Sequence, residues 1–224
     1  MVCKRSKARR QHMKLTINTS FQENTSSPYL LILVDSEHLQ KVASTYKIND
    51  LNTIIEAAQF KSSLTESLTL IGKVADCNHT VLMGIDKAND LSPAKLAKIA
   101  QSIIKASQKK FKQISIDISA LTSEQHYLFA MALTQANYIF DEYKSKKNHC
   151  ILETIHLIST DSALNPQQLN LIHAVQTGQS WARDLGNRPG NICFPEYLAE
   201  QAQALAAEYP ELLKVTVINE QQMA

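Results

Sequence analysis

Short apolar runs alternate with helical patterns through residues 14–160 of this 224-residue chain. The clearest run is Tyr29–Val34, YLLILV, whose unbroken apolar character predicts a strand covered on both faces of a sheet. Strands that alternate in this way with helices predict a layered α/β domain. The other predicted strands are residues 13–17, 67–74, 80–85, 114–118 and 150–158.

Capping signals mark where the helices begin. Ser92-Pro93 predicts one helix start, and Thr122 with Gln125 predicts a capping box for the next. Asn165-Pro166 begins a long helix that we expect to end at Gly186. Its apolar positions form one continuous stripe, which needs a partner surface. The stripe consists of Leu171, Ala174, Val175, Gly178, Trp181, Ala182 and Leu185.

A break follows this helix at residues 187–191, Asn-Arg-Pro-Gly-Asn. Proline holds Arg188 in extended geometry, and Gly190 permits a turn with positive φ. Pro195 then begins another helical pattern. We expect a new domain to start here, and residues 188–224 are too few to bury a core of their own.

Composition is typical of a soluble globular protein, with 44% hydrophobic and 20% charged residues. The four cysteines are far apart and form no CxxC pair, which argues against a zinc knuckle and suits a reducing cytoplasm. No apolar run approaches the ~20 residues that a membrane span needs. These features predict a cytoplasmic protein.

The formal charge of +2 hides a strong asymmetry. Residues 1–12 hold five basic and no acidic residues, and the remainder holds 18 basic and 21 acidic residues. We interpret residues 1–12 as a disordered tail. A basic arm that attracts nucleic acid or a membrane is the alternative.

Three candidate sites have a structural interpretation as well as a functional one. Glu153 and His156, with the pair His149-Cys150, suggest metal ligands only in isolation, since the predicted strand around them is apolar. Packing is the favoured role for Cys150, His156 and also Cys193. Gly72 and Gly84 are the glycines of the α/β part, and they are not clustered as a phosphate-binding loop requires.

The segment from Trp181 to Ala202, WARDLGNRPGNICFPEYLAEQA, closely resembles the interdomain junction of leucyl aminopeptidases, or cytosol aminopeptidases. Residues 215–223 resemble the first strand and next helix start of the family's catalytic domain, and residues 138–147 resemble the end of its N-terminal domain. Phe194 departs from the family, which often has threonine there, and its side chain cannot cap the helix.

The resemblance implies a macro-domain-like N-terminal domain, with a mixed sheet flanked by helices, over residues 13–160. A bridging helix over 161–187 and the beginning of the catalytic domain over 188–224 would follow. The family consists of hexameric exopeptidases that remove N-terminal amino acids from peptides, with two divalent metals (zinc or manganese) that activate a water. Its metal ligands lie in a Gly-Lys-Gly stretch followed by Phe-Asp, and in an Asn-Thr-Asp-Ala-Glu-Gly-Arg stretch. Neither stretch occurs in this sequence.

We therefore assign no catalytic, cofactor-binding or metal residue, and expect a non-catalytic N-terminal part of an aminopeptidase that is inactive alone. Arg183, Asp184 and Arg188 could pair with the catalytic domain, although a structural role is favoured. Two alternatives stay open. One is a DNA-binding or assembly module, and the other is an inactive truncated gene product.

Overall fold

The computed structural model describes residues 13–20, 27–75, 77–146, 150–160 and 164–223. The predicted tail over residues 1–12 and the candidate ligand His149 lie outside the described residues. The chain divides into two compact units, Met1–Thr177 and Gly178–Ala224. Each is described by itself below.

The first unit contains a six-stranded mixed sheet in the order β1-β6-β5-β2-β4-β3. Parallel pairing joins β1, β6, β5, β2 and β4, and β3 is an antiparallel edge strand. The predicted layered α/β fold is therefore confirmed. The strands are β1 Lys14–Asn18, β2 Tyr29–Val34, β3 Ser67–Leu70, β4 His79–Gly84, β5 Gln113–Asp117 and β6 Thr154–Ile158.

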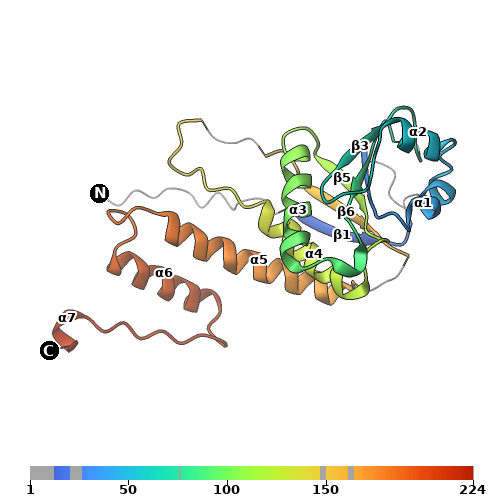
Figure 1. Ribbon diagram of the computed structural model, residues 1–224. Helices are drawn as coiled ribbons and strands as arrows, with labels where there is room; N and C mark the ends of the chain where they lie inside the picture. Colours follow the sequence, from blue (N-terminus) through green and yellow to red (C-terminus); the bar gives the residue numbers. More distant parts are fainter. Residues whose placement is uncertain (1–12, 21–26, 76, 147–149, 161–163, 224) are drawn as a thin grey trace. The chain divides into compact units, whose positions relative to one another are not determined.

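The central strand β2 has all six residues buried, as the apolar run predicts. Alternate residues of this strand enter two separate cores, because successive side chains point to opposite faces of a sheet. Leu31 and Leu33 lie in one cluster, which also contains residues of the helices α3 (Pro93–Ser107) and α4 (Ser123–Ala136). Leu30 and Ile32 lie in the other cluster, with residues of the helices α1 (Leu39–Tyr46) and α2 (Leu51–Ala57). Figure 1 shows the helices α1 to α4 of the first unit around this sheet.

Two short helices, α1 (Leu39–Tyr46) and α2 (Leu51–Ala57), cover the second face and were not predicted. Both have apolar residues at helical spacing, and Val42, Tyr46 and Leu51 are buried. Their length of about two turns gives too weak a periodic signal for recognition, and tertiary packing stabilises them.

The predicted helix starts on the first face are confirmed. Helix α3 (Pro93–Ser107) begins after Ser92, whose side chain accepts a hydrogen bond from the Lys95 N–H. Helix α4 (Ser123–Ala136) begins after Thr122, whose N–H donates to Gln125 Oε1 at 3.0 Å. A short 3₁₀ segment, η2 (Ala88–Asp90), precedes α3.

The long helix α5 (Pro166–Asn187) begins where the asparagine–proline pair predicts and ends one residue beyond Gly186. Its buried positions are Leu169, Ile172 and Gln176. The predicted stripe is a different face of the helix, and two of its large side chains, Leu171 and Trp181, are 53% and 38% exposed. That the predicted stripe contacts a partner surface stays a prediction, and Leu169 and Ile172 form a second apolar side of the helix that packs in the first unit.

In the second unit, helix α6 (Pro195–Glu208) begins at the predicted proline, and a short helix α7 spans Glu220–Met223. The strand expected within residues 215–219 is not formed. A strand requires backbone partners on a neighbouring strand, and the described residues pair no segment with this one. None of the described helices is long and apolar enough to cross a membrane.

Candidate functional site

The carboxyl ends of the parallel strands are the place where α/β sheets bind ligands, at the point where successive helices change sides. Strand β2 leads into α1 on one face, whereas its neighbours β4 and β5 lead into α3 and α4 on the other. The switch point therefore lies at the end of β2. Asp35 directly follows β2, and Asp117 ends β5.

The Asp35 carboxylate makes hydrogen bonds within its own chain. Its Oδ1 atom accepts hydrogen bonds from the backbone N–H groups of Glu37 and His38, at 3.0 and 2.8 Å. The imidazole Nδ1 of His38 also lies 2.7 Å from Oδ1. Burial alone would raise the pKa of Asp35, but the hydrogen bonds and the charge of His38 together outweigh burial and lower this pKa. The Asp35 carboxylate thus stabilises the turn that connects β2 to α1.

A second network joins the loops that follow β4 and β5. The N–H of Ala88 lies 3.4 Å from Asp35 Oδ2, and the buried side chain of Gln125 donates to the Ala88 carbonyl at 2.8 Å. Gln125 also accepts from the N–H of Thr122. Three loops at the carboxyl edge are therefore held together through side chains that satisfy backbone groups.

Asp117 is equally engaged. Its Oδ2 atom accepts a hydrogen bond of 2.7 Å from the Tyr46 hydroxyl, and its Oδ1 atom accepts one of 2.8 Å from the Ser119 N–H. Burial, followed by the charge of Asp117, raises the pKa of Tyr46 well above its ordinary value. The pair fixes the end of α1 against the sheet. Both carboxylates at the switch point serve the fold, so this edge does not offer them as free ligands.

The two glycines of the α/β part do not form a phosphate cradle. A Cβ atom on Gly84 would lie 2.3 Å from the Ser63 carbonyl oxygen, so this glycine allows the chain around Ser62 and Ser63 to approach β4. Gly72 has a φ of +105° and lies in the connection between β3 and β4, with open space around it. One glycine serves close packing and the other a turn.

The described residues around β6 that were considered as metal ligands do not converge. The His156 side chain contacts Thr16 of β1, with Nδ1 2.7 Å from the hydroxyl oxygen. Its Nε2 atom is buried and has no hydrogen-bond partner among the described residues. Cys150 Sγ lies 3.5 Å from Asn137 Oδ1, and the side chain of Glu153 is exposed. The predicted strand over residues 150–158 is also shorter, because residues 150–153 make only scattered backbone bonds before β6 begins.

The surroundings of His156 favour its neutral form. Burial, followed by the nearby charge of Lys14, lowers the pKa of this histidine, which keeps the imidazole neutral. In the described part of the chain, no group of three or more histidine, cysteine, aspartate or glutamate side chains could hold a metal ion. These residues therefore do not fit the two-metal centre that the resemblance implies for the complete enzyme.

The hinge residues have local partners. An Arg188 guanidinium N–H donates to the Tyr197 hydroxyl, and the guanidinium carbon lies 5.4 Å from the centre of the tyrosine ring. The carbonyl of Pro189 accepts bonds from the N–H groups of Ile192 and Cys193, at 2.8 and 2.9 Å. These contacts support the structural interpretation of the hinge.

Three residues of the hinge, Gly190, Phe194 and Cys193, can be compared with what the sequence predicts. Gly190 permits a positive φ but does not adopt one, because Gly72 is the glycine with positive φ among the described residues. Phe194 makes no side-chain cap for α6, as expected. Cys193 is a half-buried free thiol, and its packing role stays a prediction.

Sequence reasoning missed the side chains that organise the carboxyl edge: Asp35, His38, Tyr46 and Asp117. The available signal was an aspartate directly after a buried strand, at Asp35, and another at the end of an alternating strand, at Asp117. Tyr46 carried no such signal, because its partner lies 71 residues away in the sequence.

The fold and the sequence of this chain are both similar to those of known proteins. A mutant of tomato leucine aminopeptidase superposes with a TM-score of 0.76, covering 97% of this chain and 46% of that chain, at 16% sequence identity. At this identity the similarity concerns the fold alone. The family model of the cytosol aminopeptidase family, N-terminal domain, matches residues 31–147. The chain belongs to the cytosol aminopeptidase family.

Curated relatives agree with this assignment. A probable cytosol aminopeptidase of Acinetobacter baumannii is 61% identical over 212 residues, which cover 95% of this chain and 44% of that protein. A probable cytosol aminopeptidase of Acinetobacter baylyi is 58% identical over the same shares. A third, from Pseudomonas syringae pv. tomato, is 29% identical and covers 85% of this chain and 44% of that protein. The chain spans less than half the length of these relatives.

Proposed function

We propose that these 224 residues are the non-catalytic N-terminal part of an exopeptidase that removes N-terminal amino acids from peptides. The observation that carries the proposal is the family match together with relatives of which the chain covers 44%. The carboxylates at the switch point are engaged by the fold, which supports a structural rather than a catalytic role for this part.

The metals and the catalytic residues would then belong to the complete protein and not to these residues. The relatives' name supports an aminopeptidase that acts on peptides in the cytoplasm. The family resemblance implies two divalent ions, zinc or manganese, and a hexameric assembly of the complete enzyme. The domain scheme of residues 13–160, 161–187 and 188–224 belongs to the same proposal.

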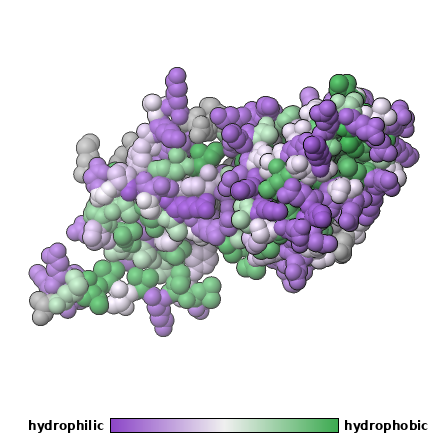
Figure 2. Space-filling model, viewed as in Figure 1, coloured by the Kyte–Doolittle hydropathy of each residue, from purple (hydrophilic) through white to green (hydrophobic). Residues whose placement is uncertain are grey.

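The second unit supplies the physical argument that further polypeptide is needed. None of its described residues is buried, and α6 has no buried position. Figure 2 shows apolar side chains gathered along this part of the chain. We propose that the catalytic domain of the complete enzyme covers these side chains.

The test is an activity assay with two polypeptides. The 224-residue chain, mixed with manganese or zinc, should not hydrolyse a leucyl amide above the rate of the metal alone. Co-expression with the part of the Acinetobacter baumannii relative that this chain does not match should give a stable complex. Hydrolysis by the 224-residue chain alone would contradict the proposal.

A further inference from the structure

Strand β3 lies at an edge of the sheet and pairs with β4 on one side. An edge strand presents a row of backbone N–H and C=O groups that can pair with another strand. Charged side chains or proline within the strand usually prevent such pairing. Strand β3, SLTL, contains neither, whereas the opposite edge strand, β1, contains Lys14. Apart from its short length, the edge formed by β3 therefore lacks protection against another strand.

The hydrogen bonds to β4 fix which residues of β3 face the open side. The Gly84 N–H donates to the Glu66 carbonyl at 2.8 Å, just before β3 begins. In an antiparallel strand, the backbone groups of successive residues alternate between the two sides of the strand. The N–H and C=O groups of Ser67 and Thr69 therefore point away from β4, and both side chains are exposed.

An exposed isoleucine directly follows β3. Ile71 is 101% exposed, the highest value among the large apolar side chains of the described residues. It lies two residues beyond Thr69, so an extended backbone would give it the same outward direction. A strand that paired with the open edge as far as Ile71 would cover this side chain, and burial of apolar surface is favourable. Gly72, with a φ of +105°, then ends the extended segment.

The segment from Glu66 to Lys73, ESLTLIGK, is complementary to a reversed copy of itself. A twofold axis at Thr69 would place this residue opposite Thr69 of a second copy. The same register would place Ser67 opposite Ile71 of the second copy. These are the residues whose backbone groups face the open side, so their hydrogen bonds can form without disturbing the pairing of β3 with β4.

The side chains favour this register and the antiparallel direction. Leu68 would lie opposite Leu70 of the second copy, on the face where both leucines contact the core cluster beside α1 and α2. The two Thr69 side chains would form a favourable cross-strand pair on the other face. Opposite charges would approach at each end, because Glu66 lies opposite the residue before Lys73. A parallel arrangement would instead bring like charges together, and a register centred two residues earlier would place Leu68 opposite Glu66.

We propose that β3 pairs with β3 of a second copy of this chain, antiparallel about a twofold axis, so that the two sheets become continuous. The matching apolar pairs and the complementary charges select a second copy over an unrelated strand, and the full exposure of Ile71 disfavours solvent alone. The contact is short, so the association of the isolated chain is weak and transient. This inference does not depend on the aminopeptidase activity proposed above.

A cysteine at the twofold axis tests the register. Opposite residues of a hydrogen-bonded antiparallel pair have Cα atoms about 5.5 Å apart, which is within the range of a disulfide. Under mild oxidation, Thr69→Cys should form a disulfide-linked dimer about tenfold faster than Thr53→Cys, because the axis holds only the first pair in range. Thr53 is exposed in α2 and outside β3, and the wild-type chain gives the background from its own cysteines.

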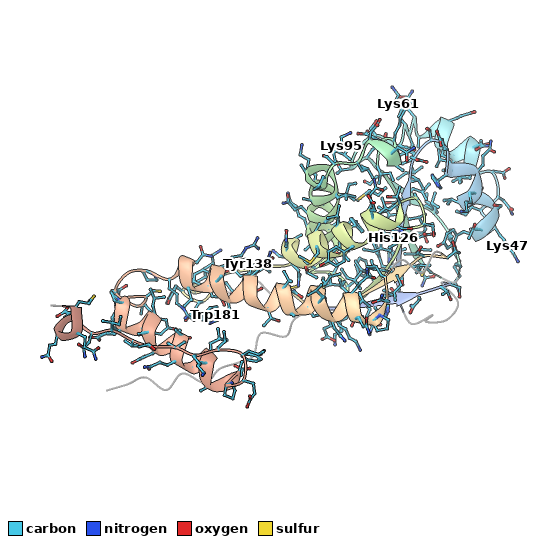
Figure 3. The ribbon with its side chains drawn as sticks, turned by 90° about the horizontal axis from the view of Figure 1, so that it is seen from below. Lys47, Lys61, Lys95, His126, Tyr138 and Trp181 are labelled. Atoms are coloured by element: carbon cyan, nitrogen blue, oxygen red, sulfur yellow. The ribbon has the colours of Figure 1, made fainter. Side chains whose placement is uncertain are left out.

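Sedimentation velocity over a concentration series measures the self-association itself. Thr69→Lys places like charges opposite each other and should weaken the dimer by about tenfold. Thr53→Lys makes the same change of charge away from β3 and should weaken it by less than about twofold. Lys73→Glu should also weaken the dimer more than Lys47→Glu, whose exposed lysine lies at the end of α1 and is labelled in Figure 3.

Three results would overturn the proposal. Equal rates of disulfide formation in Thr69→Cys and Thr53→Cys would show that β3 does not pair with its copy. Equal dimer constants for Thr69→Lys and Thr53→Lys would assign the self-association to another surface, such as the exposed apolar side chains of the second unit. A wild-type chain that stays monomeric at every concentration would exclude the contact. Thermal melting verifies that each variant is folded.

Discussion

The two compact units of the chain use their apolar side chains in opposite ways. Residues 13–177 enclose a sheet between two buried clusters, and Ile32, Ile99 and Phe129 are fully buried there. None of residues 178–223 is buried, and the apolar side chains Leu212, Ile218 and Met223 are 81%, 60% and 70% exposed. The first unit therefore has the buried core that an independent domain needs, whereas the second leaves its apolar side chains uncovered.

The comparison predicts its largest effect in the core of the first unit. Phe129→Ala removes a fully buried ring of α4 and leaves a cavity, so we expect a loss of about 3–5 kcal/mol in the free energy of unfolding. Urea denaturation of the wild-type and variant chains measures this loss. A loss under about 1 kcal/mol would show that this core is not well packed.

The hydrogen bond between Tyr46 and Asp117 should have an intermediate effect. Tyr46→Phe leaves Asp117 Oδ2 buried without its donor, and we expect a cost of about 1–3 kcal/mol. Thr53→Ala, at an exposed position in α2, is the control and should cost under about 0.5 kcal/mol. Equal stability of the two variants would mean that this pair does not fix α1.

Asp35 provides a pH-dependent prediction. Its pKa is lowered in the folded state, so its contribution is present above the pKa of the unfolded chain and is lost as pH falls through the folded pKa. Asp35→Asn should therefore destabilise the chain by about 1–3 kcal/mol at neutral pH. The difference from wild type should shrink below about pH 4. A constant difference from pH 7 to pH 3 in urea denaturation would contradict this account.

The smallest effect is expected in the second unit. Leu198 of α6 is 45% exposed, so Leu198→Ala should change the stability of the 224-residue chain by under about 0.5 kcal/mol. In a complex with the remaining part of the relatives, the same substitution should weaken association. Equal effects of Leu198→Ala on the chain alone and on the complex would contradict the difference between the two units.

How far the sequence could predict the structure depended on how local each signal was. The bounds of β2 and the starts of α3 and α4 follow from an apolar run and from caps, which involve neighbouring residues only. The burial of α5 through Leu169 and Ile172 depends on the surface that it meets, and the missing strand after Val215 depends on partner strands. A local sequence pattern does not predict such long-range contacts.

The candidate site shows the same division. From the sequence we expect a packing role for His156, and the structure places its side chain beside Thr16. The close approach of Ser63 to Gly84 was not predicted, because it joins residues about 20 positions apart. The pairing of Tyr46 with Asp117 joins α1 to β5 across the sheet, and only the folded arrangement brings the two side chains together.

Hydrogen exchange on the intact 224-residue chain tests the contrast between the units most directly. The amides of β2 and β5 should be protected to the level of global unfolding, since both strands lie inside the sheet. The amides of α6 should exchange orders of magnitude faster, because a helix of this length without buried positions is marginal in water. Equal protection of α6 and β2 would contradict the account, because the second unit would then be stable without further polypeptide.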